Sequence, residues 1–184
     1  ENHLLTQNIN SLEQRNLVDP LTGLGNARYL QQKMLDSLRQ LESRGGALCY
    51  LLIGLDDVQH LRGQHGDEFY NELLRSVARR LQQHVRPLDV LTRLDDNHFG
   101  LLTLLTDLQE CSPTSFKRLH EGLNLKAFKT SEGFISLKAG ISLVGMDAQS
   151  LPVTPQTLLE RANTLLPDAC STGRINAVRL PKAQ

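Results

Sequence analysis

The sequence predicts an α/β or α+β fold built on one mixed sheet. Apolar runs of strand length alternate with longer segments in which apolar residues recur at helical spacing. Two of the runs, 90–94 and 99–105, are separated only by the polar residues 95–98, which is typical of a hairpin. Because helices alternate with strands and with a hairpin, we expect helices packed on a single sheet that contains both parallel and antiparallel strands.

The expected order of elements is β-α-β-β-α-β-α-β, with a helix in front. Residues 1–17 carry apolar side chains at helical spacing among polar ones, so an amphipathic lead-in helix is expected there, either as a signalling linker or as a plain N-terminal helix. A turn-rich stretch over 19–26 precedes a helix from 27 to about 43, which Arg44-Gly45-Gly46 ends. The near-continuous apolar run 47–53 indicates a buried strand.

The second half of the chain continues this alternation. A loop or helical turn over 56–63 leads to a helix over 67–84, which Arg86-Pro87-Leu88-Asp89 ends before the hairpin. The remaining expected elements are a helix from Ser112-Pro113 to about Leu125, a strand over 134–144, a helix from Pro155 to about Ala169 closed by Gly173, and a strand over 177–180.

Composition sets limits on function. The 184 residues suit one domain, placed at 18–184, behind the lead-in helix. The formal net charge of +0 argues against a nucleic-acid binder. No signal peptide or membrane-spanning run is found, so we expect a cytoplasmic fragment without membrane contact, cut from a longer protein that is either soluble or membrane-bound. The three cysteines Cys49, Cys111 and Cys170 are far apart and odd in number, so neither a disulfide framework nor a metal cluster is expected, and a reducing compartment fits.

The stretch DPLTGLGNARYL at 19–30 resembles the entry motif D-x-L-T-G-L-x-N-R of bacterial GGDEF domains, the fold of diguanylate cyclases, although Ala27 stands where that family has Arg. The order of elements continues the resemblance to about Val178. The resemblance implies a nucleotide-cyclase-like domain with a central, mixed, mainly antiparallel five-stranded sheet flanked by helices. It also implies nucleotide binding and signal transduction through cyclic di-GMP.

The family's first site follows the pattern L-L-D-I-D-x-F-K-x-I-N-D-x-x-G-H-x-x-G-D, which matches the run LLIGLDDVQHLRGQHGDEFYN. In this register Gly54 replaces the first metal-binding Asp, and Asp56 keeps the second. Gln59 replaces a phosphate-contacting Lys, Arg62 a guanine-binding Asn and Asn71 a guanine-binding Asp, while Gly66 keeps a glycine. The letters GDEF at 66–69 are interpreted as the start of a helix, because Asp67 and Glu68 suit its first turn.

The signature R-x-G-G-D/E-E-F belongs instead to the hairpin, where the chain reads Arg93-Leu94-Asp95-Asp96-Asn97-His98-Phe99. Arg93 and Phe99 are kept, but both glycines are lost and Asn97 replaces a metal-binding carboxylate. At the C-terminal end the pattern A-D-x-A-L-Y-x-A-K-x-x-G-R-N matches ANTLLPDACSTGRIN at 162–176. There Cys170 replaces a phosphate-binding Lys, Pro167 is expected to interrupt the helix, and Arg174 is kept.

These losses predict a degenerate domain with no catalytic residue, no metal site and no cofactor, because Mg²⁺ requires carboxylate oxygens and phosphoryl transfer requires the metal. A weak metal site at Asp56 alone, or at Asp95 and Asp96 shifted within the loop, is the alternative. The vestigial site comprises Gly54, Asp56, Asn71, Asp95, Asp96, Asn97, His98 and Arg174.

One motif of the family is intact. Arg86-Pro87-Leu88-Asp89 lies five residues before the signature position, where the family's inhibitory R-x-x-D site binds cyclic di-GMP. Arg presents a planar fork to guanine O6 and N7, and Asp accepts from the opposite edge of the base. Lys117 and Arg118 are candidate auxiliary residues. The other interpretation is an ordinary turn that ends a helix, with Arg86 solvated.

Three hypotheses remain open. The first is an inactive module that senses cyclic di-GMP through Arg86 and Asp89. The second is a ligand-free module that forms a homodimer, or that relays a signal from an upstream sensor to a downstream domain such as an EAL phosphodiesterase. The third is an active cyclase, or another GTP-using enzyme, with a rearranged site.

Overall fold

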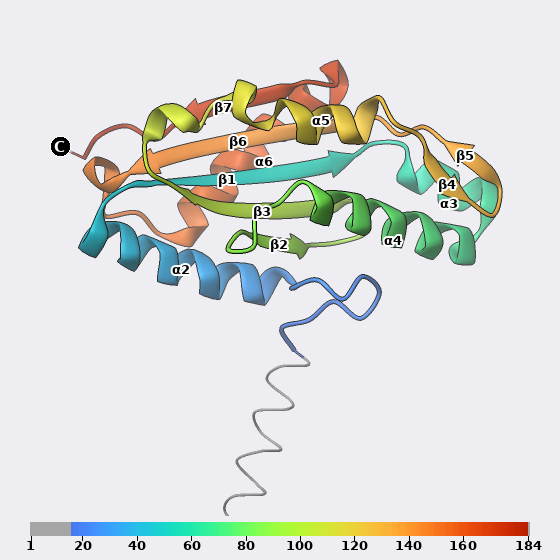
Figure 1. Ribbon diagram of the computed structural model, residues 1–184, viewed down its shortest axis with the longest axis horizontal. Coiled ribbons are helices and arrows are strands. Elements are labelled where there is room, and N and C mark those ends of the chain that lie inside the picture. The colour runs from blue at the N-terminus through green and yellow to red at the C-terminus, as the bar shows by residue number, and fades with distance from the viewer. Residues whose placement is uncertain (1–15, 184) are drawn as a thin grey trace, which may run out of the picture.

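A five-stranded sheet forms the middle layer of the fold in the computed structural model, which describes residues 16–183 (Figure 1). The strand order is β2-β3-β1-β6-β7. Only β6 and β7 run parallel, and the other neighbouring strands are antiparallel. The predicted mixed, mainly antiparallel sheet is therefore confirmed. The bounds of the strands are β1 Ala47–Leu55, β2 Val90–Arg93, β3 His98–Leu105, β6 Ala139–Asp147 and β7 Ile175–Arg179.

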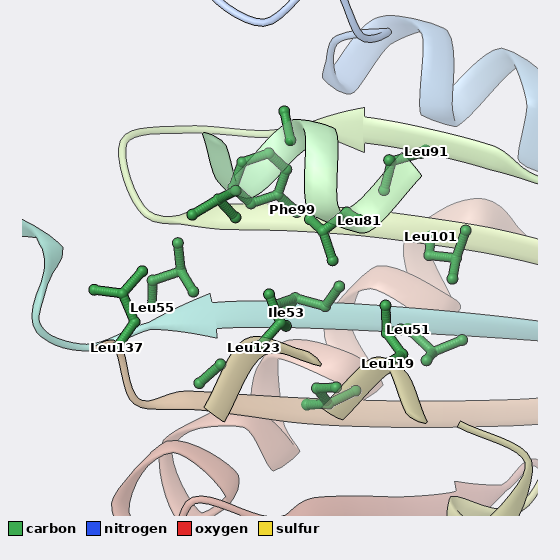
Figure 2. Close-up of a cluster of buried hydrophobic side chains, with 14 of the residues drawn as sticks. Leu51, Ile53, Leu55, Leu81, Leu91, Phe99, Leu101, Leu119, Leu123 and Leu137 are labelled. Atoms are coloured by element: carbon green, nitrogen blue, oxygen red, sulfur yellow. The ribbon is translucent and has the colours of Figure 1, made fainter. Parts of the chain in front are cut away.

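Helices cover both faces of the sheet because its central strand is apolar on both sides. Every residue of β1 is buried. Leu51, Ile53 and Leu55 face α4 (Asp67–Gln83) and α5 (Lys117–Asn124), and Figure 2 shows Leu119 and Leu123 of α5 turned towards them. The alternate β1 residues face α2 (Ala27–Arg44) and α6 (Pro155–Thr172). Two hydrophobic clusters, one on each face, thus hold the layers together.

The remaining elements are short. They are α3 Val58–His65, a two-stranded ribbon of β4 Phe128–Thr130 and β5 Gly133–Ile135, and three 3₁₀ turns over Leu108–Glu110, Pro113–Phe116 and Ala148–Ser150. The helix starts follow local chemistry: the Asn26 side chain accepts from the Tyr29 N–H at the start of α2, and Asp67 and Glu68 fill the first turn of α4. The letters GDEF therefore do open a helix, as the sequence indicates.

Three expected elements differ in detail. The predicted strand over 134–144 is two strands, because the chain leaves the β4–β5 ribbon at Ile135 and joins the main sheet only at Ala139. The predicted helix from Ser112 begins as a 3₁₀ turn and becomes α-helical at Lys117. Pro167 does not interrupt α6, which runs unbroken to Thr172, where Gly173 takes a left-handed conformation that caps it.

The continuity of α6 has a packing reason. A proline inside a helix removes one backbone hydrogen bond. The buried face of α6, formed by Leu158, Ala162, Leu166, Ala169 and Cys170, stays in contact with the sheet on both sides of Pro167. Tertiary packing therefore outweighs the local preference of one residue.

Residues 1–15 and 184 lie outside the described part of the chain, and with them most of the predicted lead-in helix over 1–17. Asn16 and Leu17 belong to a turn. Among the described helices, none has the length and apolarity needed to cross a membrane.

Candidate functional site

The positions that the family uses for metal and phosphate converge at one end of the sheet. Gly54, near the end of β1, pairs with His98 of β3 on one side and with Gly140 of β6 on the other. The C-terminal turn of α6, with Cys170, lies directly over both glycines. The register drawn from the sequence therefore brings Gly54, His98 and Cys170 together in space.

Side chains of α6 fill the space above Gly54. A Cβ atom at position 54 would stand 2.8 Å from Cys170 Sγ and 3.1 Å from Leu166 Cδ2. At Gly140 a Cβ would meet the backbone itself, 2.5 Å from the carbonyl carbon of Ala169. Both glycines thus permit a close approach of α6 to the sheet. An aspartate at position 54 would have to displace the side chains of Leu166 and Cys170.

Cys170 is a buried thiol and supplies no charge to this end of the sheet. Burial, and next to it the negative charge of Asp56, raise its pKa to about 11. The thiol is therefore neutral at physiological pH. Asp56 itself is exposed at the end of β1, and its N–H donates to the Lys138 carbonyl oxygen. Asp56 is the only carboxylate at positions 54–56.

Arg174, the residue that the sequence keeps from the C-terminal pattern, is also exposed at this end. Its backbone carbonyl accepts from the Ile141 N–H as β7 joins β6.

The hairpin between β2 and β3 is held by its own polar side chains. One carboxylate oxygen of Asp95 accepts from the Asn97 N–H at 3.0 Å and lies 2.7 Å from His98 Nδ1. Burial opposes ionisation of Asp95, but the hydrogen bonds from His98 and Asn97 outweigh it and lower the pKa of the carboxyl group. Asp95 is therefore an ionised turn residue whose carboxylate is already engaged.

An arginine, Arg62, occupies one of the two positions that contact guanine in the family. Arg62 on α3 lies 2.8 Å from Asp67 and 3.7 Å from Asp96 of the hairpin. Its guanidinium sits over the ring of Tyr70, 4.4 Å from the centroid. Tyr70 stands where the family pattern has the glycine of its G-D pair. Its hydroxyl donates to the Asp96 carbonyl oxygen and accepts from Arg93.

Two other positions of the family register, 59 and 71, lie on the neighbouring helices. Asn71 is half-buried on α4 and Gln59 is exposed on α3.

Arg93 links the hairpin to the entry motif. Its guanidinium forms a 2.9 Å ion pair with Asp19, and both side chains are mostly buried. The side chains of Arg62 and Tyr70 therefore occupy the gap between the start of α4 and the hairpin.

The second candidate site is a turn with an open pocket. Asp89 accepts from the Arg86 N–H at 2.9 Å and from the Thr103 hydroxyl at 2.7 Å, and its side chain is 9% exposed. The Arg86 side chain is 57% exposed and donates to Thr103 Oγ1 and to the Leu104 carbonyl oxygen. The carboxylate is thus fixed by the fold, while part of the guanidinium remains free for another acceptor.

A cavity of about 420 Å³ opens beside this turn, between β3 and α5. Its walls include Arg86, Asp89, Arg118 and His84, with Phe116 and other apolar side chains below. Lys117 does not line it; its ammonium lies 3.8 Å from Glu121 on the exposed surface. Of the two auxiliary candidates, the structure brings only Arg118 to the pocket.

Three cations lie near His84, which lines this pocket together with Arg86, Arg118 and the carboxylates of Asp89 and Glu110. Burial lowers the pKa of its imidazole, and the cations Lys126, Arg80 and Arg118 lower it further. A pocket lined by two arginines and bordered by other cations suits a ligand that carries negative charge and hydrogen-bond acceptors.

Sequence reasoning missed three residues of these sites. Leu166 appears as an ordinary core residue of α6, Tyr70 as an ordinary aromatic on α4, and Thr103 as one residue of an apolar strand. The glycine position of the family pattern could have identified Tyr70. Nothing in the sequence places Leu166 against Gly54 or Thr103 against Asp89, because both contacts join distant segments.

Comparison with known proteins gives consistent results. Residues 16–176 match the family described as diguanylate cyclase, GGDEF domain. The response regulator PleD of Caulobacter vibrioides is 31% identical over 163 residues, covering 88% of this chain and 35% of PleD. The cyclic di-GMP phosphodiesterase NbdA of Pseudomonas aeruginosa is 26% identical over 167 residues, covering 91% of this chain and 21% of NbdA. The chain thus spans about a third or less of these relatives.

A solved structure matches the fold over nearly the whole chain. The coiled coil and GGDEF domain of DgcB from Caulobacter crescentus, in complex with c-di-GMP, has a TM-score of 0.81 at 14% identity. The match covers 96% of this chain and 93% of that one. At this level of identity the likeness concerns the fold alone.

Proposed function

Because the chain belongs to the GGDEF family of diguanylate cyclase domains, we propose that it is a catalytically inactive member that serves as a regulatory module and binds cyclic di-GMP through Arg86 and Asp89. One observation carries this proposal. The chain's own side chains fill both halves of the nucleotide site, whereas the pocket beside Arg86 and Asp89 is open.

The metal and phosphate half lacks the groups that the reaction needs. Joining two GTP molecules is phosphoryl transfer, and most of its catalysis is metal-assisted charge stabilisation. Mg²⁺ binds carboxylate oxygens at short, fixed distances. At position 54 the chain offers a bare backbone covered by Leu166 and Cys170, and at position 97 it offers a neutral amide. Asp56 alone does not provide the octahedral set of oxygen ligands that Mg²⁺ requires.

In the guanine-binding half of the site, the Arg62 side chain already contacts Tyr70, Asp67 and Asp96. A guanine that entered the gap would have to displace Arg62 from the face of Tyr70 and from its two carboxylates. The family's Asn and Asp, which read the base, are Arg62 and Asn71 here. Asp95 and Asp96 add negative charge where a triphosphate would lie. The residues at this half thus favour the closed arrangement over a bound nucleotide.

The open pocket has the chemistry for the dinucleotide. Arg86 can present the exposed part of its guanidinium to guanine O6 and N7. Asp89, whose two oxygens accept from the Arg86 N–H and the Thr103 hydroxyl, holds Arg86 in place through a 3.5 Å ion pair. Arg118, on the opposite wall, supplies a second cation for a phosphate diester. The c-di-GMP in the structure of DgcB, a protein of the same fold, supports this choice of ligand.

A second candidate is a ligand-free relay module. It is favoured by the internal contacts of Arg86 with Thr103 and Leu104, which an ordinary turn would also make. It is also consistent with the relative NbdA, a cyclic di-GMP phosphodiesterase of which the match to this chain covers only 21%. In that role the domain would dimerise, or couple a neighbouring sensor to an EAL-type effector, without binding nucleotide.

Variants at the pocket distinguish these functions. Binding of fluorescently labelled cyclic di-GMP to the purified chain is measured beside Arg86→Ala, Arg118→Ala and the matched control Lys117→Ala. The receptor role predicts micromolar binding that Arg86→Ala abolishes, Arg118→Ala weakens and Lys117→Ala leaves intact. Equal binding by all variants, or none by the parent chain, would reject the Arg86–Asp89 site. Incubation with GTP and Mg²⁺ should yield no cyclic di-GMP; turnover that Asp56→Ala reduces would reject the inactive assignment.

A further inference from the structure

Two cysteines that are 62 positions apart in the sequence meet on one face of the sheet. Cys49 of β1 pairs directly with Gly145 of β6. Because Gly145 has no side chain, Cys111 packs in its place: its Cβ and Sγ lie 2.8 Å and 3.3 Å from the point where a Cβ at 145 would stand. Cys111 Sγ also lies 3.6 Å from the carbonyl oxygen of Leu48, in the peptide group that precedes Cys49.

Cys111 therefore lies next to the place where a cross-strand neighbour of Cys49 would be. A disulfide joins Cβ atoms about 3.5–4.5 Å apart. Cys111 can move to that separation from Cys49, since it lies between two short 3₁₀ turns, most of whose residues are exposed.

The two thiols are also unequal in reactivity. A hydrogen bond from Cys49 lowers the pKa of Cys111, whereas burial and the contact with Cys111 raise the pKa of Cys49. Cys111 is thus the better nucleophile of the pair, and Cys49 is placed to resolve an adduct on it.

We propose that Cys49 and Cys111 form a reversible disulfide that controls the Arg86–Asp89 pocket. The oxidant is a low-molecular-weight disulfide. Local opening of the segment between the two 3₁₀ turns must first expose Cys111, which is 3% exposed in the folded chain. Its thiolate then attacks one sulfur atom of the oxidant, breaks that S–S bond and releases one thiolate. The Cys49 thiolate then attacks the Cys111 sulfur, forms the internal S–S bond and releases the second thiolate. The protein loses two electrons and two protons, and the small disulfide is reduced to two thiols.

Each cysteine is connected to one wall of the pocket through a neighbouring residue. Cys49 pairs with Thr103 of β3, and the Thr103 hydroxyl bonds to both Asp89 and Arg86. Cys111 is followed by the segment that carries Phe116 and Arg118, on the opposite wall. Drawing Cys111 towards β1 moves that wall inward and narrows the entrance. This regulatory step, unlike the disulfide itself, rests on the proposed function.

Oxidised glutathione is the probe for the disulfide. The folded chain is incubated with it, the remaining thiols are alkylated and the peptides are mapped by mass spectrometry. We expect a Cys49–Cys111 link in the parent chain and in Cys170→Ser, which removes the third buried cysteine, and no link in Cys111→Ser. Persistently free thiols, a glutathione adduct that stays on Cys111, or a link through Cys170 would overturn the proposal.

Ligand binding tests the regulatory step separately. The oxidised chain should bind cyclic di-GMP at least fivefold more weakly than the reduced chain, and dithiothreitol should restore the affinity. Cys111→Ser should bind equally before and after oxidation. A linked chain with undiminished affinity would refute the regulatory step. A chain that forms the link on oxidation, but that binds no cyclic di-GMP even after reduction, would refute the proposed function and leave the disulfide established.

Discussion

Replacing Gly54 by alanine tests whether α6 closes the metal end of the site. The added Cβ would stand 2.8 Å from Cys170 Sγ and 3.1 Å from Leu166 Cδ2, both below ordinary van der Waals separation. Both side chains are more than nine-tenths buried, so neither can move without disturbing its own neighbours. We therefore expect Gly54→Ala to destabilise the domain, although alanine is usually preferred to glycine.

The magnitude follows from two opposed effects. Overpacking a core costs about 1–3 kcal/mol, and loss of the glycine's freedom in the unfolded chain offsets about 0.4–1 kcal/mol of that. The expected net loss in the free energy of unfolding is about 0–2.6 kcal/mol, centred near 1 kcal/mol. For a domain of this size the upper limit corresponds to a fall in Tm of about 10 °C. Urea and thermal unfolding, followed by circular dichroism, measure both quantities.

Alanine substitutions at two other glycines provide a comparison for the stability change of Gly54→Ala. At Gly63 on α3 a Cβ meets nothing within 4 Å, so Gly63→Ala should stabilise by about 0.5–1 kcal/mol. At Gly140 the Cβ would strike the backbone of α6, so Gly140→Ala should cost more than about 3 kcal/mol. Adding Cys170→Ala to Gly54→Ala should recover part of the loss through a favourable coupling of at least about 0.5 kcal/mol. A Gly54→Ala variant as stable as Gly63→Ala would refute the packing that we describe.

Three further predictions concern the two sites. Arg93→Ala should destabilise by about 3 kcal/mol in urea unfolding, because it leaves the mostly buried Asp19 without its cation. Arg62→Ala, which removes ion pairs near the surface, should change the stability much less in the same assay. Because the folded pKa of His84 lies below its unfolded value near 6.5, the free domain should lose stability as pH falls through about 6.5, and an anionic ligand should favour the imidazolium. Cyclic di-GMP should therefore bind more tightly at pH 6 than at pH 8, and His84→Gln should flatten this dependence; an unchanged pH profile would remove His84 from the site. Restoring carboxylates with Gly54→Asp and Asn97→Glu should still give no cyclic di-GMP from GTP and Mg²⁺ by chromatography, because Leu166 and Cys170 keep position 54 closed; product formation would contradict this.

The fold could be predicted well where hydrophobic periodicity is strong and local. The apolar run at 47–53, the helix ended by Arg44-Gly45-Gly46 and the hairpin at 90–105 all lie where the pattern indicates. The pattern failed at Pro167, where burial of α6 outweighs a single residue's preference, and at 134–144. In that second segment the apolar character continues while the chain changes its strand partner, which periodicity alone does not report.

The candidate sites could be predicted as positions but not as contacts. The family register identified Gly54, Cys170 and Arg62 as replacements. It did not show that the first two pack against each other or that Arg62 bridges to Asp96. Likewise the motif identified Arg86 and Asp89, while their common partner Thr103 lies 14 residues beyond Asp89 on the neighbouring strand. Such contacts depend on strand register and helix packing, which no single segment of the sequence contains.

The most direct test is one pair of calorimetric titrations of the purified chain, with cyclic di-GMP and with GTP plus Mg²⁺. A receptor with a filled nucleotide site should release or absorb heat with cyclic di-GMP in the micromolar range and give no binding heat with GTP. Binding of GTP with Mg²⁺, in the absence of any response to cyclic di-GMP, would contradict both the receptor role and the filled nucleotide site.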